Sequence, residues 1–541
     1  MKAWLTSDLY AFDLNASADS ISTALHGTLP DSTSQVARLY EANNYGLHWI
    51  ENDGTLRPHA EALIEALPEA ERHGLSFSED RLNDLRTRFE EARSHASLEN
   101  VIALDLALSD LAIQFGTDLR MGRVNPQNLK AEVYIKASSD DFGDVLSAWM
   151  TEPEPPSFTE TFAPDHPIYL RLQEALQRYR QYAKDGGWET VAEGADDLVL
   201  EIGETSPYVP ALRNRLALAG NLASSSEDST YDVNVAAAVA DFQERHGLAV
   251  DSVLGPNTLA ALNVPIDARI LQLELALERW RWLPHELADR FILTNVPGFN
   301  VYAIENNDNI ALEMRTVVGA AYGDQETPVL ADTMTYVDFR PYWNVPDGIA
   351  ANEIMPKVRE DASYLDQKQY EIVSHFGSDA TVYDVSEVDL DEIPGQYHIR
   401  QRPGPHNSLG LVKFMFPNEH AIYLHDTPAD ALFDRAERDF SHGCVRLAEP
   451  DRFGAYILGR QGWDLARVQD AMQSGDHQIV SLEEPIPVYI MYLSAFAEPD
   501  GYVTLHDDIY GQDADLATRL NANATDNLAA HAETLASLLQ D

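Results

Sequence analysis

The hydrophobic pattern of this 541-residue chain changes its period, and this change constrains the fold most. Up to about residue 200, apolar residues recur three or four positions apart, as in residues 98–119, which is typical of amphipathic helices. After about residue 290 they recur at every second position, as in residues 315–318 and 335–339, which indicates strands. The sequence therefore predicts a multidomain α+β protein.

Turn residues and changes in the hydrophobic pattern divide the chain further. The expected parts are an N-terminal segment (1–35), a helical domain (36–200), a three-helix module (206–264), a β-rich domain (270–495) with an insertion at 347–396, and a C-terminal segment (496–541). Residues 152–167, rich in proline and acidic residues, are expected to form an extended loop. An insertion of about 50 residues between strands is a candidate lid, because structureless connections of that length are uncommon.

The charge balance excludes one class of function. Against 88 acidic residues stand 38 Lys and Arg, which gives a formal net charge of -50. Such a chain repels nucleic acid and anionic membrane surfaces, so no nucleic-acid partner is expected. No apolar run is long enough to predict a transmembrane segment, and residues 1–20 lack the apolar core of a secretory signal.

The single cysteine, Cys444, carries the strongest chemical signal. It excludes an intramolecular disulfide framework and a multi-cysteine metal site within one chain. Upstream, apolar residues alternate with Tyr423 and His425, which predicts a strand with both on one face. Gly443 permits a tight backbone path before the thiol, and the pattern of residues 450–458 predicts a helix soon after it. Proximity to a helix N-terminus and an imidazole is expected to give the thiol thiolate character.

Three histidines near Cys444 could act as its general base: His420, His425 and His442. We choose His425, because the predicted strand delivers its imidazole, and assign His442 to shaping the turn and the oxyanion site. The alternatives are a zinc site built from His425, His442 and Cys444, and a buried bystander thiol. Because no His-Glu-x-x-His zinc signature is present, we expect neither a metal nor another cofactor.

Two stretches resemble known families. Residues 235–262 resemble the three-helix peptidoglycan-binding module, although the usual Asp-Gly of its loop is Asp251-Ser252 here. The alternative is a helical bundle used only for packing. His425, followed by Ser-His-Gly-Cys-Val-Arg at residues 441–446, resembles the signature of the L,D-transpeptidase (YkuD-type) catalytic family.

The second resemblance extends well beyond the signature. It includes residues 317–319 with 327–328, residues 341–346, and residues 400–405 leading into 409–414. These runs look like the large periplasmic members, which carry a helical scaffold domain, a peptidoglycan-binding module and a capping insertion. The resemblance thus covers about residues 36–512.

Carried over to this sequence, the family implies roles for individual residues. Cys444 would be the nucleophile and His425 its base, with the Gly443 and Cys444 amides as the oxyanion hole and His442 beside it. Candidates for positioning the substrate are Tyr423, Arg446, Asn344 and Ser441. Asp426 replaces the hydroxyl residue or glycine that follows the histidine in some members, so either Asp426 or a backbone carbonyl could orient the imidazole.

The implied activity is cross-linking of peptidoglycan in cell-wall biosynthesis and the maintenance of cell shape, in the periplasm. Tetrapeptide stems would serve as donor and acceptor, with release of D-Ala, a cysteine thioester, a 3-3 cross-link as product, and sensitivity to carbapenems. Two alternatives remain open. One is a hydrolase, an L,D-carboxypeptidase or amidase-type enzyme acting on the same thioester; the other is a non-enzymatic peptidoglycan-binding protein.

Overall fold

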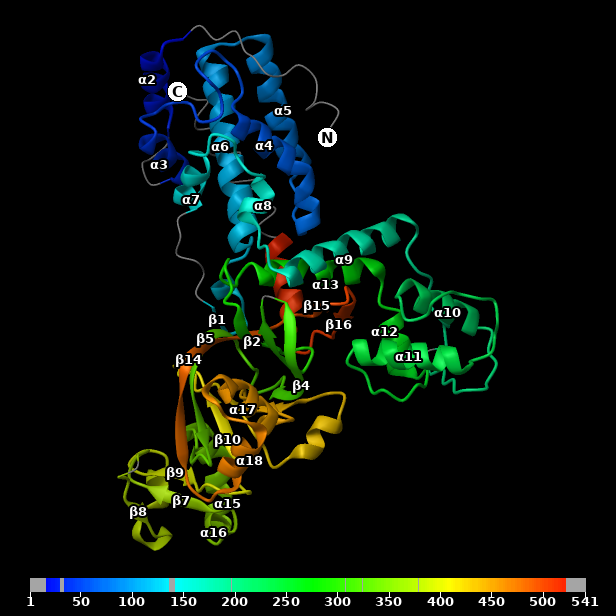
Figure 1. The fold of residues 1–541 in the computed structure, drawn as a ribbon, viewed down its shortest axis with the longest axis vertical. Coiled ribbons are helices and arrows are strands. Elements are labelled where there is room, and N and C mark those ends of the chain that lie inside the picture. Colours follow the sequence, from blue (N-terminus) through cyan, green and yellow to red (C-terminus); the bar gives the residue numbers. More distant parts are fainter. Residues whose placement is uncertain are drawn as a thin grey trace. The chain divides into compact units, whose positions relative to one another are not determined.

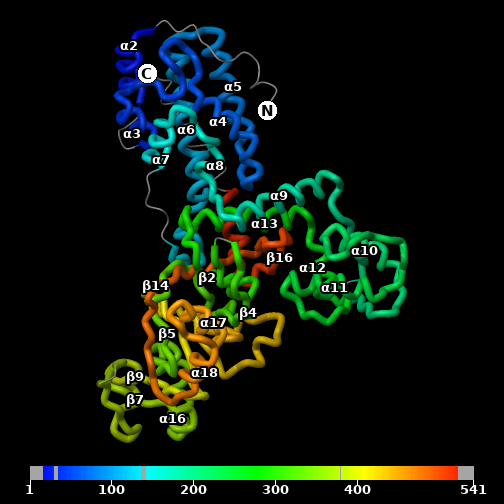
Figure 2. Tube along the Cα trace, viewed as in Figure 1, coloured from blue at the N-terminus to red at the C-terminus, as the bar shows by residue number. Residues whose placement is uncertain are grey.

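The computed structural model describes residues 16–29, 34–135, 142–195, 197–306, 308–323, 325–377 and 379–521 (Figures 1 and 2). The chain forms two compact units. The first comprises Met1–His246, Val250–Leu287 and Tyr492–Asp541, and the second comprises Gly247–Ala249 and Ala288–Met491. Helices dominate the first unit and strands the second, which confirms the predicted α+β class. Residues 1–15, where a secretory signal was sought, lie outside the described residues.

The first unit is built from helices and one strand pair. Its α-helices are α2 (Ala18–Thr28), α3 (Gln35–Ala42), α4 (Pro58–Ala66), α5 (Glu79–Ser94), α6 (Leu98–Met121), α7 (Phe142–Trp149), α8 (Phe158–Phe162), α9 (Pro167–Lys184), α10 (Val209–Leu218), α11 (Val233–Arg245), α12 (Pro256–Leu262) and α13 (Ile266–Trp280). Short 3-10 turns are η1 (Leu67–His73) and η2 (Pro126–Asn128), and the strands are β1 (Val133–Tyr134), β15 (Ala495–Ala497) and β16 (Val503–Leu505). Strands β15 and β16 pair antiparallel.

Helix α6 forms where the helical period predicted it. Ser97 caps its N-terminus, since the hydroxyl accepts a hydrogen bond from the Asn100 amide at 3.2 Å. Gly116 lets Phe142 approach closely, because a Cβ there would lie 1.9 Å from the ring. The expectation for residues 152–167 was wrong in part: Ser157 caps the short helix α8 within that stretch, and Phe158 and Phe162 bury their rings.

Helices α10, α11 and α12 form the predicted three-helix module. The side chain of Gln243 holds the loop between α11 and α12: its amide donates to Asp251 Oδ1 at 2.7 Å, and its oxygen accepts from the Ser252 amide at 3.0 Å. Ser252 lies in the left-handed region with φ of 62°, where the glycine usual in the family would carry no steric cost. The Gln243 hydrogen bonds therefore hold the turn that the Asp251-Ser252 departure left uncertain.

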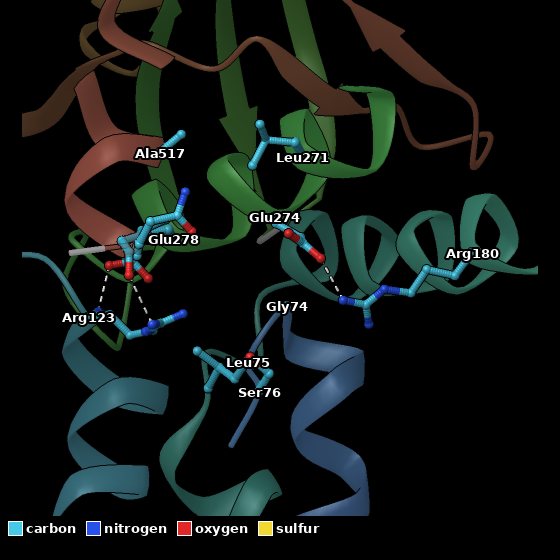
Figure 3. Close-up of a pocket in the computed structure, with 11 residues that line it drawn as sticks. Gly74, Leu75, Ser76, Arg123, Arg180, Leu271, Glu274, Glu278 and Ala517 are labelled. Carbon is cyan, nitrogen blue, oxygen red and sulfur yellow. Dashed lines mark hydrogen bonds and ion pairs between the residues drawn. The ribbon is translucent and has the colours of Figure 1, made fainter. Parts of the chain in front are cut away.

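The first unit also contains a cavity of about 160 Å³ between helical segments (Figure 3). Arg180 and Glu274 form an ion pair of 2.6 Å at its wall. Glu278, almost fully buried, accepts hydrogen bonds from the amides of Arg123 at 2.6 Å and Val124 at 2.9 Å, and pairs with Arg281 at 2.8 Å. The buried charges are thus compensated within the unit.

One large sheet and a small one form the second unit. Its strands are β2 (Arg290–Asn295), β3 (Asn300–Glu305), β4 (Asn309–Gly319), β5 (Val329–Phe339), β6 (Trp343–Asn344), β7 (Tyr370–Val373), β8 (Val382–Tyr383), β9 (His398–Gln401), β10 (Val412–Met415), β11 (Leu424–His425), β12 (Asp439–Ser441), β13 (Val445–Leu447) and β14 (Gln478–Met491). Within this unit the large sheet runs β5-β10-β11-β13-β4-β3-β2-β14, and β12 pairs with β4. Because β14 also pairs with β5, the sheet closes on itself. Helices α17 (Pro450–Leu458) and α18 (Leu465–Gln473) pack on each other, with η7 (Gly459–Gln461) between them in the chain, and η6 (Asp430–Asp434) lies between β11 and β12.

The insertion forms a small subdomain with its own core. Strands β6-β9-β7-β8 make its sheet, and its helices are α14 (Asp347–Ile349), the π-helix η3 (Ala350–Ile354), α15 (Met355–Glu360), α16 (Tyr364–Gln367), and the 3-10 turns η4 (Val385–Glu387) and η5 (Leu390–Glu392). Ile354, Met355, Val358 and Ile372 are among its buried core residues. Residues 347–396 are therefore a folded element rather than a loose loop.

The second unit is narrower than the expected domain of residues 270–495. Helix α13 packs against α9 in the first unit, and the chain from Tyr492 onward also belongs there. The amphipathic period of residues 270–283 could not reveal this, because such a face fits either unit. In the part of the chain that the structure describes, no helix is long and apolar enough to cross a membrane.

Candidate active site

Two short parallel strands bring Cys444 and His425 to one face of the large sheet. In the β11–β13 ladder Leu424 lies opposite Val445, and His425 lies opposite Arg446. The Val445 amide donates to the Tyr423 carbonyl at 3.1 Å, so one step earlier in the same register Tyr423 stands beside Cys444. Because side chains alternate along a strand, all four face the same way. Cys444 and His425 are thus diagonal neighbours, and Tyr423 and His425 share one face, as the alternation predicted.

The thiol of Cys444 is partly buried and rests in its neutral form. Its Sγ donates a hydrogen bond to the Ala421 carbonyl at 3.4 Å. Burial raises the pKa of Cys444 to about 11, while Tyr423, Arg446 and Lys413 act in the opposite direction. This corrects the expectation of thiolate character. Strand β13 follows the cysteine directly, and α17 begins only at Pro450, so the helix expected soon after the cysteine does not start at it.

The imidazole of His425 is buried and held by the backbone. Its Nδ1 donates to the main-chain carbonyl of Asp426 at 2.5 Å. The Asp426 carboxylate is engaged elsewhere: it accepts hydrogen bonds from the amides of Leu411 and Thr427, both at 2.7 Å. The sequence left open whether the Asp426 side chain or a backbone carbonyl orients the imidazole; in the structure the backbone carbonyl of Asp426 does so. With Nδ1 donating, a neutral ring keeps Nε2 as its proton acceptor.

The charge state of His425 follows from its surroundings. Burial and, to a lesser extent, the cations Arg446 and Lys413 together lower the pKa of His425 to about 3. At neutral pH the pair therefore consists of an uncharged thiol and an uncharged imidazole. A pair in this state transfers its proton when the sulfur attacks, rather than beforehand.

The turn before Cys444 is fixed by two hydroxyl groups. Ser441 Oγ donates to the Cys444 carbonyl at 2.6 Å and accepts from the Gly443 amide at 3.2 Å. Thr327 Oγ1 donates to the Gly443 carbonyl at 2.8 Å. Gly443 has φ of 105°, and a Cβ there would meet Ile422 at 3.3 Å, so glycine is required. No local sequence pattern predicted a role for Thr327; the one signal was that residues 327–328 belong to a run that resembles the family.

The two expected oxyanion donors differ in the structure. The Gly443 amide already donates to Ser441, whereas the Cys444 amide has no acceptor among the described residues. An open N–H beside a nucleophile can receive the negative oxygen of a tetrahedral intermediate. The role of both amides stays a prediction.

The remaining predicted residues fall into two groups. Tyr423 lies at the pair: burial and the nearby Cys444 raise the pKa of its hydroxyl, and its ring centroid is 5.7 Å from that of His425. Arg446 is partly buried, and its Nε has no hydrogen-bond partner among the described residues.

His442 and Asn344 belong to the second group. His442 turns toward the insertion, where its Nε2 pairs with Glu353 Oε1 at 2.6 Å. Asn344 is exposed on β6, opposite Arg400 of β9. In the described ranges, no group of three or more His, Cys, Asp and Glu is arranged to hold a metal ion.

Three family models match the chain. The L,D-transpeptidase catalytic domain (YkuD) matches residues 289–468, which include Cys444 and His425. A scaffold domain matches residues 34–176, and a model described as "Putative peptidoglycan binding domain" matches residues 205–262. The chain therefore combines a YkuD-type catalytic domain with a scaffold domain and a peptidoglycan-binding domain, as the resemblance implied.

A curated relative from Haemophilus influenzae, described as "Putative L,D-transpeptidase", is 33% identical over 224 residues. The match covers 41% of this chain and 44% of the relative, so the chain spans less than half of the relative's length in this match. Among solved structures, an L,D-transpeptidase fragment from Xylanimonas cellulosilytica is 15% identical with a TM-score of 0.18, covering 54% of this chain and 97% of the other. An L,D-transpeptidase from Stackebrandtia nassauensis is 13% identical with a TM-score of 0.24, covering 54% and 94%.

Proposed function

We propose that this chain is a cysteine-dependent L,D-transpeptidase that forms 3-3 cross-links between peptidoglycan tetrapeptide stems. The observation that carries the proposal is the β11–β13 register, which sets His425 diagonal to the only cysteine inside the region matching the YkuD model. A nucleophile and a base at this spacing on a rigid sheet are suited to acyl transfer.

In the acylation step, Cys444 Sγ attacks the carbonyl carbon that precedes the terminal D-Ala of the donor stem. The thiol proton passes to His425 Nε2 as the carbon–sulfur bond forms. The carbonyl oxygen becomes negative and is stabilised by the Cys444 amide. The bond to D-Ala then breaks, and His425 returns the proton to the departing amine, which leaves a thioester.

In the second step, the side-chain amine of the acceptor stem attacks the thioester carbon. His425 takes a proton from that amine and delivers it to the departing sulfur, so that the thiol is restored. Both steps use one base in both directions, and neither needs a metal or another cofactor. The proposed partners are therefore two tetrapeptide stems, one as donor and one as acceptor.

Arg446 and Tyr423 are proposed to position the donor stem. The partly buried guanidinium stands next to the pair, and the surroundings of its Nε supply no acceptor among the described residues. A stem peptide carries carboxylates that could fill this role, and Arg is well suited to binding them. Asn344 is exposed on the strand that leads into the insertion, and we propose that it contacts the peptide from that side. Ser441 acts indirectly, because it fixes the Gly443–Cys444 turn.

The insertion is proposed to act as a lid that excludes water from the thioester. Glu353, on the π-helix η3, pairs with His442 two residues before Cys444, so the insertion contacts the loop of the nucleophile. Trp343, on the first strand of the insertion's sheet, is close enough to Tyr423 to act on the pKa of its hydroxyl, which burial raises. Lids of this kind protect reactive intermediates.

We also propose that the protein acts outside the cytoplasm, in the periplasm, where its polymer substrate lies.

Intact-protein mass spectrometry tests the proposal. The protein is exposed to a disaccharide-tetrapeptide and then to an amine acceptor. The expected result is one adduct of the tripeptide stem on Cys444, which disappears when the acceptor is added as cross-linked dimer is formed. Tripeptide as the only product would favour the hydrolase, and the absence of any adduct together with wall binding would favour a non-enzymatic protein. Cys444→Ala serves as the control that must stay unmodified.

A further inference from the structure

Four charged or titratable side chains form one row across the large sheet. Asp338 of β5 lies opposite Lys413 of β10, Lys413 lies opposite His425 of β11, and His425 lies opposite Arg446 of β13. Directly opposed residues share a face of the sheet, so the four side chains lie side by side. The proposed base therefore has a cation on each flanking strand.

Lys413 has a defined position in this row. Its Nζ lies 3.2 Å from Asp338 Oδ2, and the lysine side chain is 16% exposed against 7% for the aspartate. On its other side, Nζ lies 5.7 Å from the centroid of the Tyr423 ring, and Tyr423 stands beside Cys444 in the β11–β13 register. His477 holds the second oxygen of Asp338, with Nε2 at 2.8 Å from Oδ1. The lysine is thus anchored by one carboxylate while its ammonium group lies over the tyrosine that stands beside the nucleophile.

The titratable groups around Cys444 and His425 come from strands β10, β11 and β13 and from the residues next to them. Strand β10 supplies Lys413, β13 supplies Arg446, and the turn before β13 supplies Cys444 itself. The chain of β11 supplies Tyr423 and, just after the strand, Asp426. Asp426 turns its carboxylate to the amides of Leu411 and Thr427, so the charges that face His425 are the two cations.

We propose that Lys413, anchored by Asp338, is a positioning residue that keeps His425 in its neutral, proton-accepting form and stabilises the sulfur anion as it forms at Cys444. A cation on the adjacent strand acts on a partly buried charge because water screens that charge poorly. Arg446 cannot replace this effect, since it approaches from the opposite strand and is proposed to bind the donor stem. The inference rests on the proposed function only in its choice of nucleophile and base.

The reactivity of Cys444 toward iodoacetamide tests this inference without peptidoglycan. The protein has one cysteine, so the labelling rate reports that thiol alone. The rate is measured between pH 7 and 10 for the wild type and for Lys413→Met, Lys413→Arg and Asp338→Asn. Lys357→Met is the matched control, because Lys357 also places Nζ over a tyrosine ring, 5.5 Å from Tyr364, but lies in the insertion.

Lys413→Met should slow labelling about tenfold at each pH, because the thiolate loses a cation, and the profile should move to higher pH. Lys413→Arg should restore the wild-type rate within about threefold. Asp338→Asn should act in the opposite direction and raise the rate, since the charge of Lys413 is then no longer partly neutralised. Lys357→Met should have no effect.

Two results would overturn the inference. One is a Lys413→Met protein labelled at the wild-type rate; the other is an Asp338→Asn protein labelled more slowly than the wild type. Should circular dichroism show that Lys413→Met is unfolded, the comparison of Asp338→Asn with Lys413→Arg decides alone.

The acid limb of acylation by a carbapenem gives the matching readout for His425, and it should move to higher pH in Lys413→Met. If the Lys413 and Asp338 variants change the labelling rate as expected but the wild type forms no carbapenem adduct, the proposed function is refuted while the role of Lys413 stands.

Discussion

Each unit of the molecule contains a buried polar cluster, and the two clusters are satisfied to different degrees. In the helical unit, Asp105 of α6 is fully buried and accepts hydrogen bonds from the amides of His48 at 3.0 Å, Trp49 at 2.9 Å and Ile50 at 3.2 Å. The hydroxyl of Tyr40 donates to the same carboxylate. Every oxygen of this carboxylate thus has donors.

In the β-rich unit, the cluster around Cys444 leaves groups open. Within the described residues, the Cys444 amide and Arg446 Nε have no acceptor. Buried polar groups are nearly always paired, so an unpaired one next to a nucleophile points to a group supplied by a substrate. The comparison teaches that a closed network fixes a fold, whereas an open one awaits a ligand. Each prediction below alters one side of this comparison.

The largest expected effect is on turnover. Cys444→Ala and His425→Ala should each lower turnover by about a thousandfold or more, and the double variant should be little worse, because the two residues act as a unit. The free energy of unfolding should change little. Activity is measured by chromatography of cross-linked products, and carbapenem adducts by mass spectrometry. Normal activity in Cys444→Ala would rule out the mechanism.

Asp105→Ala should lower the stability of the fold while leaving catalysis by the folded protein unchanged. It leaves three backbone amides of residues 48–50 without their buried acceptor, so the free energy of unfolding should fall by about 3 kcal/mol or more. The folded fraction should keep its rate on small soluble muropeptides. Denaturant titration measures the first effect. Glu69→Ala is the control, because its ion pair with Arg72 is exposed on both sides and contributes little.

Removing the three-helix module tests whether binding and chemistry are separate. Deletion of residues 206–264 should weaken sedimentation with insoluble peptidoglycan about tenfold while attack on soluble muropeptides continues. Equal sedimentation by both proteins would return the module to a packing role. Circular dichroism checks that the shortened chain is folded.

The insertion should affect the outcome of the reaction more than its rate. Replacing residues 347–396 with a short Gly/Ser connector should leave some acylation but shift the products from dimer toward tripeptide several-fold, because water then reaches the thioester. Glu353→Gln, which weakens the contact with His442, should shift the ratio in the same direction by a smaller factor. Lys368→Gln, elsewhere in the insertion, is the control. An unchanged ratio in a folded variant would contradict the lid.

The sequence predicted those parts that depend on local patterns. The alternating residues 315–318 and 335–339 lie within β4 and β5, as expected, because alternation reports which face of a strand is buried. The same alternation placed Tyr423 and His425 on one face. The family model confirmed the catalytic domain that the signature predicted, but the roles of the individual residues stay predictions.

Other features depend on contacts that no local pattern reveals. Lys413 and Asp338 are 75 positions apart, and only the β5–β10 register makes them neighbours. The pairing of His442 with Glu353 spans 89 positions, so the sequence could not show that this histidine faces the insertion. The resting state of the thiol was misjudged because burial, which raises its pKa, cannot be read from neighbouring residues.

The smallest expected effect is on the pH dependence of the resting thiol, and it tests the open cluster directly. Burial raises the pKa of Cys444 to about 11 and lowers that of His425 to about 3, so the thiol–imidazole form is the stable one between these values. Labelling of the wild type by iodoacetamide should therefore rise with pH through at least pH 9, in proportion to the thiolate fraction, with no plateau near neutrality. An ion pair of thiolate and imidazolium would instead give a plateau at pH 6–8 that is lost in His425→Ala. The slow, rising profile would mean that the free protein holds its nucleophile unreactive and that the donor stem itself, by entering the open cluster, brings the proton transfer about.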